Sequence, residues 1–162
     1  MEDIFTLYCS SPLGIIEIKG TPEAITMTDF VEKEDPSSEA VPDVLLQCKK
    51  ELNEYFNGIR NDFNVPISPA GTDFQKKVWG ELLKIGFGNT TSYMSIAKNM
   101  SNPGAVRAVG LANGRNPIGI IIPCHRVIGE DGSLTGYAGG LWRKKWLLEH
   151  EGKASGKTPT LF

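Results

Sequence analysis

The chain has 162 residues, a mass of 17.7 kDa and a formal net charge of −2, and 40% of its residues are apolar. This composition supports a folded core, so the chain is not a disordered tail. No apolar stretch approaches the roughly 20 residues that cross a bilayer, and the acidic N-terminus lacks the pattern of a secretory signal, which excludes membrane-spanning and secreted classes.

The first third of the chain predicts a small sheet followed by a helix. Three short β-prone runs, at residues 4–9, 15–18 and 24–30, are separated by turn residues, which favours an antiparallel meander. From residue 42 to 56 the apolar residues recur at helical spacing, and Gly58 is placed to end that helix.

A linker and a second helical segment follow. Prolines and a glycine mark residues 65–71 as the linker. Thr72 and Gln75 have the spacing of a capping box, so a helix should begin there and end at Gly86 or Gly88.

Two shorter helices are predicted next. Ser92 caps the first, which ends near Met100, and Asn102 caps the second, with Pro103 as its first helical residue. The second helix continues to Ala112 and is rich in alanine and glycine. Two short helices joined by a turn match the helix-turn-helix pattern, which many proteins also use without binding DNA.

The remaining segments lead to a last helix. The apolar run at residues 118–122 has strand length, residues 129–133 form a turn, and residues 134–140 form a glycine-rich loop. Residues 141–150 predict the last helix, and the segment after it is a polar tail.

The charge is divided unevenly along the chain. Residues 1–84 carry 8 Lys and Arg against 15 Asp and Glu, a balance of −7, whereas residues 85–162 carry 9 against 4, a balance of +5. A basic second half indicates contact with a polyanion such as nucleic acid, although an inert uneven surface has the same composition.

Cys124 is the residue with the clearest chemical potential. A cysteine attacks as thiolate, so it needs a base or a positive charge beside it to lower its pKa, and His125 and Arg126 follow directly. Glu149 and Glu151 are the candidates for the acid that orients the imidazole. The alternative is a buried, inert thiol.

Metal binding is not expected, and neither is a secreted disulfide framework. The chain has two histidines, and its three cysteines are too widely spaced for a zinc site. Their odd number predicts reduced thiols in the cytoplasm, or in the nucleus of a eukaryote.

The sequence around Cys124 resembles the methylated-DNA–protein-cysteine methyltransferases, also called O6-alkylguanine-DNA alkyltransferases. The motifs that carry the resemblance extend in order over residues 71–152: Gly71-Thr72-Asp73-Phe74-Gln75, Thr91-Ser92-Tyr93, Arg107-Ala108-Val109-Gly110, Asn116-Pro117, Pro123-Cys124-His125-Arg126-Val127, Tyr137-Ala138-Gly139-Gly140-Leu141 and Trp146-Leu147-Leu148-Glu149-His150-Glu151. Across residues 1–66 the resemblance rests on two short motifs.

The resemblance implies an α+β fold and direct-reversal DNA repair. A ribonuclease-H-like sheet subdomain is expected over residues 1–66, a helical, winged-helix-like catalytic and DNA-binding subdomain over residues 71–152, and a tail over residues 153–162. The protein would be a single-use enzyme that flips a damaged guanine out of double-stranded DNA and takes the alkyl group from its O6 atom, or from O4 of thymine. No cofactor, membrane or partner protein is implied, and a monomer is expected.

The resemblance also assigns roles to residues. Cys124 would be the alkyl acceptor, His125 and Glu151 would complete a Cys–water–His–Glu relay, and Asn116 would brace the backbone around the cysteine. Arg107 would be the finger that enters the duplex. The other expected DNA contacts are Ser92, Tyr93, Ala105, Ala108 and Gly110, and Tyr93 would also donate to the base. The expected base pocket consists of Val127, Tyr137, Ala138 and Gly139.

Two positions depart from the family pattern, and two alternative functions remain. Ala138 stands where many members have a serine, and Gly119 replaces a proline of some members, so the preferred alkyl group is open. A cysteine hydrolase using Cys124, His125 and Glu151 would turn over repeatedly. A non-enzymatic helix-turn-helix regulator would not need Cys124.

Overall fold

The structure is a computed structural model that describes residues 3–154. Within these residues the chain forms two compact units. The first comprises the chain up to Ala70 together with Pro117–Ile121, and the second comprises Gly71–Asn116 together with the chain from Ile122 onward. Most of the expected tail, residues 155–162, lies outside the described residues. None of the described helices has the length and apolar character that crossing a membrane requires.

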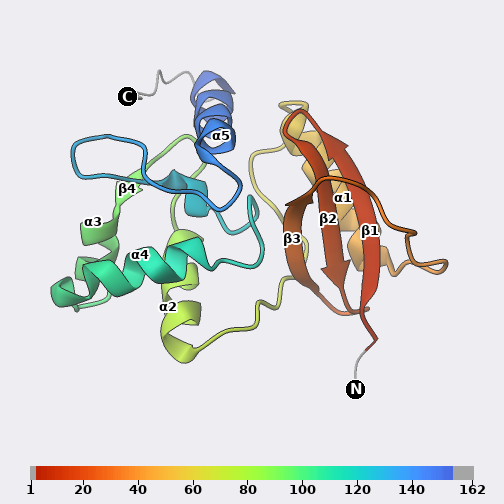
Figure 1. Cartoon of the computed structure of the whole chain (residues 1–162), viewed down its shortest axis with the longest axis horizontal. Coiled ribbons are helices and arrows are strands. Elements are labelled where there is room, and N and C mark those ends of the chain that lie inside the picture. Colours follow the sequence, from red (N-terminus) through yellow and green to blue (C-terminus); the bar gives the residue numbers. More distant parts are fainter. Residues whose placement is uncertain (1–2, 155–162) are drawn as a thin grey trace. The chain divides into compact units, whose positions relative to one another are not determined.

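The first unit is built on a three-stranded antiparallel sheet (Figure 1). Its strands are β1 (Phe5–Ser11), β2 (Gly14–Gly20) and β3 (Ile25–Val31), paired in chain order, with Cys9 opposite Ile16 on β1 and β2. The tight connection between β1 and β2 ends at Gly14, which has a φ of 113°, a backbone conformation that glycine adopts without steric cost. The predicted meander is confirmed.

Helix α1 (Asp43–Phe56) packs against this sheet and completes the core of the first unit (Figure 1). Its buried side chains include Leu45, Cys48 and Leu52. The helix ends in a Schellman motif, in which the Gly58 amide donates to the Tyr55 carbonyl and the Ile59 amide donates to the Glu54 carbonyl. Gly58 has a φ of 78°, so the predicted end of this helix is confirmed.

The strand predicted at residues 118–122 is wrong. Ile118 makes only an isolated bridge to Thr28, and the chain then turns sharply, because the Ile121 amide donates to the Gly119 carbonyl across Ile120, which has a φ of 71°. The run is apolar because its isoleucines are buried, as those of a central strand would be. Hydrophobicity alone does not distinguish these two situations.

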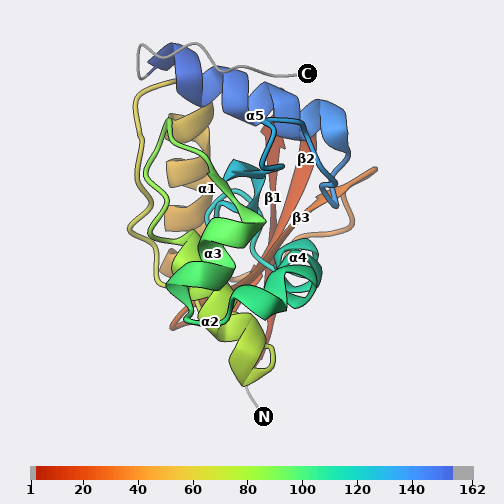
Figure 2. The same cartoon turned by 90° about the vertical axis from the view of Figure 1, so that its left-hand side faces the viewer.

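The second unit is helical and contains the predicted helix-turn-helix. Helix α2 (Asp73–Leu82) packs against α4 (Val106–Gly114) and α3 (Tyr93–Asn99), and α3 also packs against α4 (Figure 2). The single-turn 3₁₀ helix η1 (Pro103–Ala105) leads into α4, and α5 (Leu141–Ala154) ends the described chain. Together with the sheet of the first unit, these helices confirm the α+β class.

Local capping explains where these helices begin. The capping box of Thr72 and Gln75 is present, and the Ser92 hydroxyl accepts from the Ser95 amide, as predicted. Asn102 is the N-cap residue of η1 with Pro103 as its first helical residue, as predicted, although the Asn102 side chain forms no capping hydrogen bond. Helix α2 ends earlier than predicted, at Leu82, and turns follow it.

A short parallel strand pair connects the helix-turn-helix to the cysteine segment. β4 (Thr91–Ser92) pairs with β5 (Val127–Ile128), with Thr91 opposite Val127. β4 leads directly into α3, and β5 directly follows the 3₁₀ helix η2 (Cys124–Arg126). The pairing therefore holds the start of the helix-turn-helix beside the residues that follow Cys124.

Candidate active site

Cys124 begins η2, immediately after a tight turn. Pro123 has φ −83° and ψ 63°, and the Cys124 amide donates to the Ile122 carbonyl at 2.8 Å, which is an inverse γ-turn. Two asparagines hold this backbone: Asn116 Nδ2 donates to the Ile122 carbonyl at 2.8 Å, and Asn113 Nδ2 donates to the Cys124 carbonyl at 3.4 Å. The cysteine backbone is therefore held from both sides.

The Cys124 side chain is nearly enclosed, with 8% of the residue exposed. Burial raises the pKa of its thiol, while a hydrogen bond from the Asn116 side chain and the positive charge of Lys144 act in the opposite direction. Burial outweighs these two effects, so the pKa of the Cys124 thiol lies above its usual value. A nearby base is needed to generate the nucleophile.

His125 is placed to be that base. Its ring is fully buried, and Nε2 lies 2.7 Å from Glu151 Oε2. An ionised carboxylate only accepts hydrogen bonds, so Nε2 carries the proton and Nδ1 is the bare nitrogen of the neutral imidazole. Nδ1 is buried and has no hydrogen-bond partner within residues 3–154. The histidine thus presents an unused acceptor in the interior beside the cysteine segment.

Arg126 also contacts Glu151, and not the thiol. Its Nε donates to Glu151 Oε1 at 2.8 Å and its Nη2 donates to Oε2 at 3.1 Å, while Nη1 donates to the Ile85 carbonyl at 2.6 Å. Burial raises the pKa of Glu151, but the charges and hydrogen bonds of His125 and Arg126 outweigh burial and hold it below its usual range. Glu151 is therefore ionised at neutral pH.

The two glutamates proposed from the sequence have different surroundings. Glu149 is 44% exposed and lies 3.9 Å from Lys145 on the same helix, whereas Glu151 is 1% exposed and receives both His125 and Arg126. The helix geometry explains the difference, because residues two positions apart point to different sides of a helix.

Two buried polar residues near the cysteine were not found from the sequence. Asn113 lies on α4 beside the Cys124 carbonyl, and Lys144 lies on α5 with its side chain fully buried. A signal for Lys144 was present, since it precedes Leu147 by three residues and Glu151 by seven and so lies on the same helix face. Because Lys144 is charged, the sequence pattern indicated that this face of the helix is exposed.

The expected DNA-contacting residues lie on β4, α3, η1 and α4. Arg107 and Ala108 are exposed, Ala105 and Gly110 are half-buried, and the Tyr93 ring lies against Gly110, where an added Cβ would meet it at 3.8 Å. The Tyr93 hydroxyl shares a hydrogen bond with Thr135. Besides capping α3, Ser92 donates to Glu130 at 2.6 Å. The helix pair and the loop after β5 are thus in contact.

The expected base-pocket residues lie on β5 and on the loop before α5. Val127 is fully buried, Tyr137 is half-buried and Ala138 is exposed. The loop is closed by the Gly140 amide, which donates to the Tyr137 carbonyl at 2.9 Å. Arg143 fixes it from α5 by donating to the Gly139 carbonyl at 2.7 Å.

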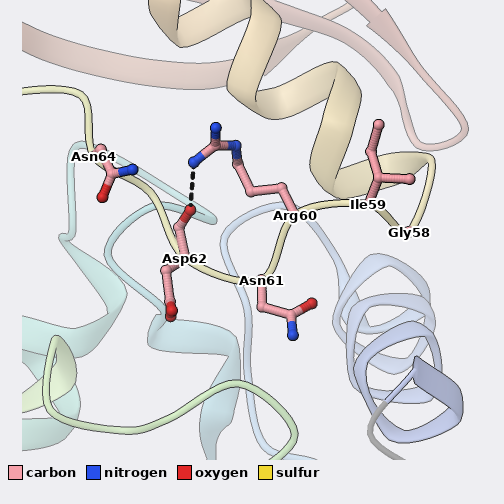
Figure 3. Close-up of a pocket in the computed structure, with 6 residues that line it drawn as sticks. All are labelled: Gly58, Ile59, Arg60, Asn61, Asp62 and Asn64. Atoms are coloured by element: carbon pink, nitrogen blue, oxygen red, sulfur yellow. Dashed lines mark hydrogen bonds between the residues drawn. The ribbon is translucent and has the colours of Figure 1, made fainter.

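A separate hollow of about 520 Å³ on the first unit does not have the chemistry of an active site (Figure 3). It is lined by the loop after α1, namely Gly58, Ile59, Arg60, Asn61, Asp62 and Asn64. Arg60 is used internally, because its Nη1 donates to the Asp62 carbonyl and its Nε donates to Glu54. The lining provides neither a nucleophile nor a paired base.

Comparison with known protein families identifies both parts of the chain. Residues 4–69 match the 6-O-methylguanine DNA methyltransferase, ribonuclease-like domain, and residues 73–153 match the DNA binding domain of the same family. The chain belongs to the O6-methylguanine DNA methyltransferase family. The resemblance proposed from the sequence is confirmed, and with it the fold class.

Individual members of the O6-methylguanine DNA methyltransferase family match over nearly their whole length. The methylated-DNA–protein-cysteine methyltransferase of Methanosarcina acetivorans is 46% identical over 149 residues, covering 88% of this chain and 94% of that protein. The crystal structure of Mycobacterium tuberculosis O6-methylguanine methyltransferase has a TM-score of 0.84 at 43% identity, covering 94% of each chain. A crystal structure of the Mycobacterium tuberculosis protein in complex with DNA matches with a TM-score of 0.83 at 44% identity, over 91% of this chain and 92% of that one.

Proposed function

We propose that this protein repairs alkylated DNA by direct reversal, taking a methyl or other alkyl group from O6 of guanine onto the sulfur of Cys124. The observation that carries the proposal is the buried hydrogen bond between His125 Nε2 and Glu151. This bond leaves His125 Nδ1 without a partner among the described residues, and His125 directly follows Cys124 in the chain. Family membership supports the same reaction. The chemistry needs no cofactor.

The reaction begins with removal of the thiol proton. His125 Nδ1 accepts that proton through a bridging water, because adjacent residues in a chain rarely bond to each other directly. The imidazolium that forms is stabilised by Glu151, whose charge Arg126 partly balances in the resting state. Asn116, which bonds to the sulfur, favours the thiolate.

Alkyl transfer is then a single displacement. The Cys124 sulfur forms a bond to the alkyl carbon while the bond from that carbon to guanine O6 breaks, and the electron pair stays on the guanine. A proton, delivered by Tyr93 or by the relay, neutralises the base as charge develops. The thioether product has no good leaving group, so water does not regenerate the cysteine and each molecule acts once.

Access to O6 requires that the nucleotide leave the base stack. We propose that Arg107, exposed on α4, fills the space that the guanine vacates, and that the small residues Ala105, Ala108 and Gly110 allow the helix to approach the groove closely. Ser92 and Tyr93 would contact the phosphate backbone. The extruded base would lie against Val127 and the loop of Tyr137, Ala138 and Gly139.

The wider organisation is proposed on the same basis. Residues 1–66 and 71–152 would be the two functional domains and residues 153–162 a tail. Double-stranded DNA is the proposed partner, and a monomer suffices because every proposed catalytic group comes from one chain. A DNA-repair role places the protein where the genome is, in the cytoplasm of a prokaryote or the nucleus of a eukaryote.

The proposal is tested by mass spectrometry of the intact protein after incubation with duplex DNA that contains O6-methylguanine. We expect a gain of one methyl group per molecule, on the peptide that carries Cys124, with no turnover after one equivalent. The Cys124→Ala variant should gain none, and Cys48→Ala, which removes another buried thiol, should behave as the wild type. Repeated turnover would favour a hydrolase, and methylation elsewhere would overturn the assignment of Cys124.

The role of Arg107 is tested with two substrates. Arg107→Ala should slow repair of duplex DNA by roughly tenfold or more while sparing the reaction with free O6-methylguanine base, which needs no extrusion. Arg115→Ala, which removes another exposed arginine at the end of the same helix, is the matched control. An equal loss on both substrates would contradict the proposed finger.

A further inference from the structure

Trp142 and Arg143, in the first turn of α5, form a cluster that the proposed mechanism does not use. The guanidinium carbon of Arg143 lies 4.6 Å from the centre of the Trp142 ring, although Trp142 is 57% exposed. The indole also lies against Gly140, where an added Cβ would meet it at 3.3 Å. The two side chains therefore contact the loop that precedes α5 as well as each other.

Arg143 holds this loop by its last peptide bond. Its Nη1 donates to the Gly139 carbonyl at 2.7 Å, and the Gly140 amide, which belongs to the same peptide bond, donates to the Tyr137 carbonyl at 2.9 Å. Both polar groups of the Gly139–Gly140 peptide are therefore paired. Glycines restrict the backbone least, so the conformation of this segment depends on such bonds, and a bond from a guanidinium is stronger than one between neutral groups.

Trp142 restricts the arginine in turn. An arginine side chain has many rotamers, and holding it in one of them costs conformational entropy. The face of an indole ring attracts a cation, and the planar guanidinium stacks on it. The contact at 4.6 Å therefore favours the Arg143 conformation that reaches the Gly139 carbonyl.

The loop that Arg143 holds contains Tyr137, Ala138 and Gly139, the residues that we propose lie against the extruded base. Neither Ala138 nor Gly139 has a hydrogen-bonding side chain, so at these positions the loop can offer the base only backbone groups. The position of a backbone group is set by the loop conformation and not by rotation of a side chain. A misplacement of about 1 Å can lower a reaction rate by about 10²-fold.

We propose that Arg143 is a positioning residue for alkyl transfer, which fixes the Gly139–Gly140 peptide bond and with it the loop against the base, and that Trp142 holds the guanidinium in place. Both residues act through the loop. The inference rests on the proposed function, because the loop conformation affects the reaction only if a base lies against it. It predicts slower alkyl transfer with unchanged reactivity of the Cys124 sulfur toward small electrophiles.

The test compares Arg143→Ala with Lys145→Ala, which removes an exposed cation from the same helix. Methyl transfer is measured with saturating duplex DNA that contains O6-methylguanine and with the free O6-methylguanine base. Arg143→Ala should lower both rates by a similar factor of about ten or more, because both substrates meet the loop, and Lys145→Ala should match the wild type. Arg107→Ala should instead spare the free base.

Two further measurements separate positioning from general damage to the fold. Alkylation of Cys124 by iodoacetamide and the affinity for undamaged duplex DNA should be the same in Arg143→Ala and the wild type, because neither requires the loop to hold a base. Arg143→Lys keeps a cationic donor but loses the planar stacking group, so it should recover part of the methyl-transfer rate. Unchanged methyl transfer in Arg143→Ala, or an equal loss of iodoacetamide reactivity, would overturn the proposal.

Trp142→Ala covers the case in which Arg143→Ala does not fold, because the Trp142 side chain is exposed. A cation–π contact at an exposed site corresponds to a factor of roughly two to five, so methyl transfer to Trp142→Ala should be slower by that factor on both substrates. Trp142→Phe, which keeps an aromatic face, should lose less. Wild-type rates in Trp142→Ala would show that the indole does not hold the arginine.

Hydrogen exchange of single amides, followed by NMR, tests the anchoring of the loop without DNA. In Arg143→Ala the Gly140 amide should exchange about tenfold faster, because its peptide bond has lost one of its two partners. The Gly132 amide, which donates to the Gly129 carbonyl in the preceding turn, is the internal control. Unchanged exchange at Gly140 would overturn the anchoring. Failure of the wild type to accept methyl groups from DNA would instead overturn the proposed function and leave the exchange result standing.

Discussion

Replacing Glu151 by glutamine tests whether the buried ionic cluster is as tightly balanced as its geometry indicates. The carboxylate accepts one hydrogen bond from His125 and two from Arg126, so both of its oxygens are used in the cluster. Glutamine has one acceptor oxygen and an NH₂ group, so one donor would face another donor and the Arg126 charge would lose its counter-charge.

The expected magnitude follows from burial. The side chains of Glu151, His125 and Arg126 are 1%, 0% and 8% exposed, so water does not screen the unpaired charge. Removing one partner of a buried ion pair costs about 3–5 kcal/mol, and we expect Glu151→Gln to lower the free energy of unfolding by that amount. Methyl transfer should fall by about 10²-fold or more, because the base is no longer oriented.

Tryptophan fluorescence during urea unfolding is the suitable assay, because all three tryptophans, at positions 79, 142 and 146, lie in the second unit with the cluster. Glu149→Gln is the matched control on the same helix. Its side chain is 44% exposed and its pair with Lys145 spans 3.9 Å, so we expect a change below about 0.5 kcal/mol. A loss below about 1 kcal/mol for Glu151→Gln, or equal losses in both variants, would refute the reasoning.

Three further outcomes are expected. The Glu151 pKa is below its usual range in the folded protein, so ionisation of Glu151 stabilises the fold at pH values above its pKa in the unfolded chain. This stabilisation declines as the pH falls below about 5. In urea titrations at pH 3–7, the Glu151→Gln variant should lack this part of the pH dependence of the free energy of unfolding. Gly110→Ala should raise the free energy of unfolding by about 0.5–1 kcal/mol, because Gly110 lies inside α4 and the new Cβ would lie 3.8 Å from the Tyr93 ring, an ordinary contact distance. If this variant repairs duplex DNA more slowly but reacts normally with the free base, this face of α4 contacts DNA. Gly58→Ala should cost about 1 kcal/mol in thermal or urea unfolding although nothing lies within 4 Å of the added Cβ, because the φ of 78° alone is unfavourable, and a neutral result would contradict this explanation.

Much of the fold follows from local patterns. The spacing of Thr72 and Gln75 is enough to predict their capping box. Gly58 could be predicted to end α1 because the hydrogen bonds that end the helix join residues close together in the chain. The same reasoning failed at residues 118–122, where burial makes a turn as apolar as a strand.

The amino-acid sequence by itself was enough to single out Cys124, with His125 beside it, and the resemblance to a repair family selected Glu151. The tertiary structure alone decided the electrostatics. Arg126 bonds to Glu151 across 25 positions of the chain, and Lys144 reaches the Val127 carbonyl across 17. Which cation lies near the thiol depends on how α5 packs against η2 and β5. The physical reason is that caps and turns are made by neighbours in the chain, whereas burial and charge compensation arise only when distant segments meet and exclude water.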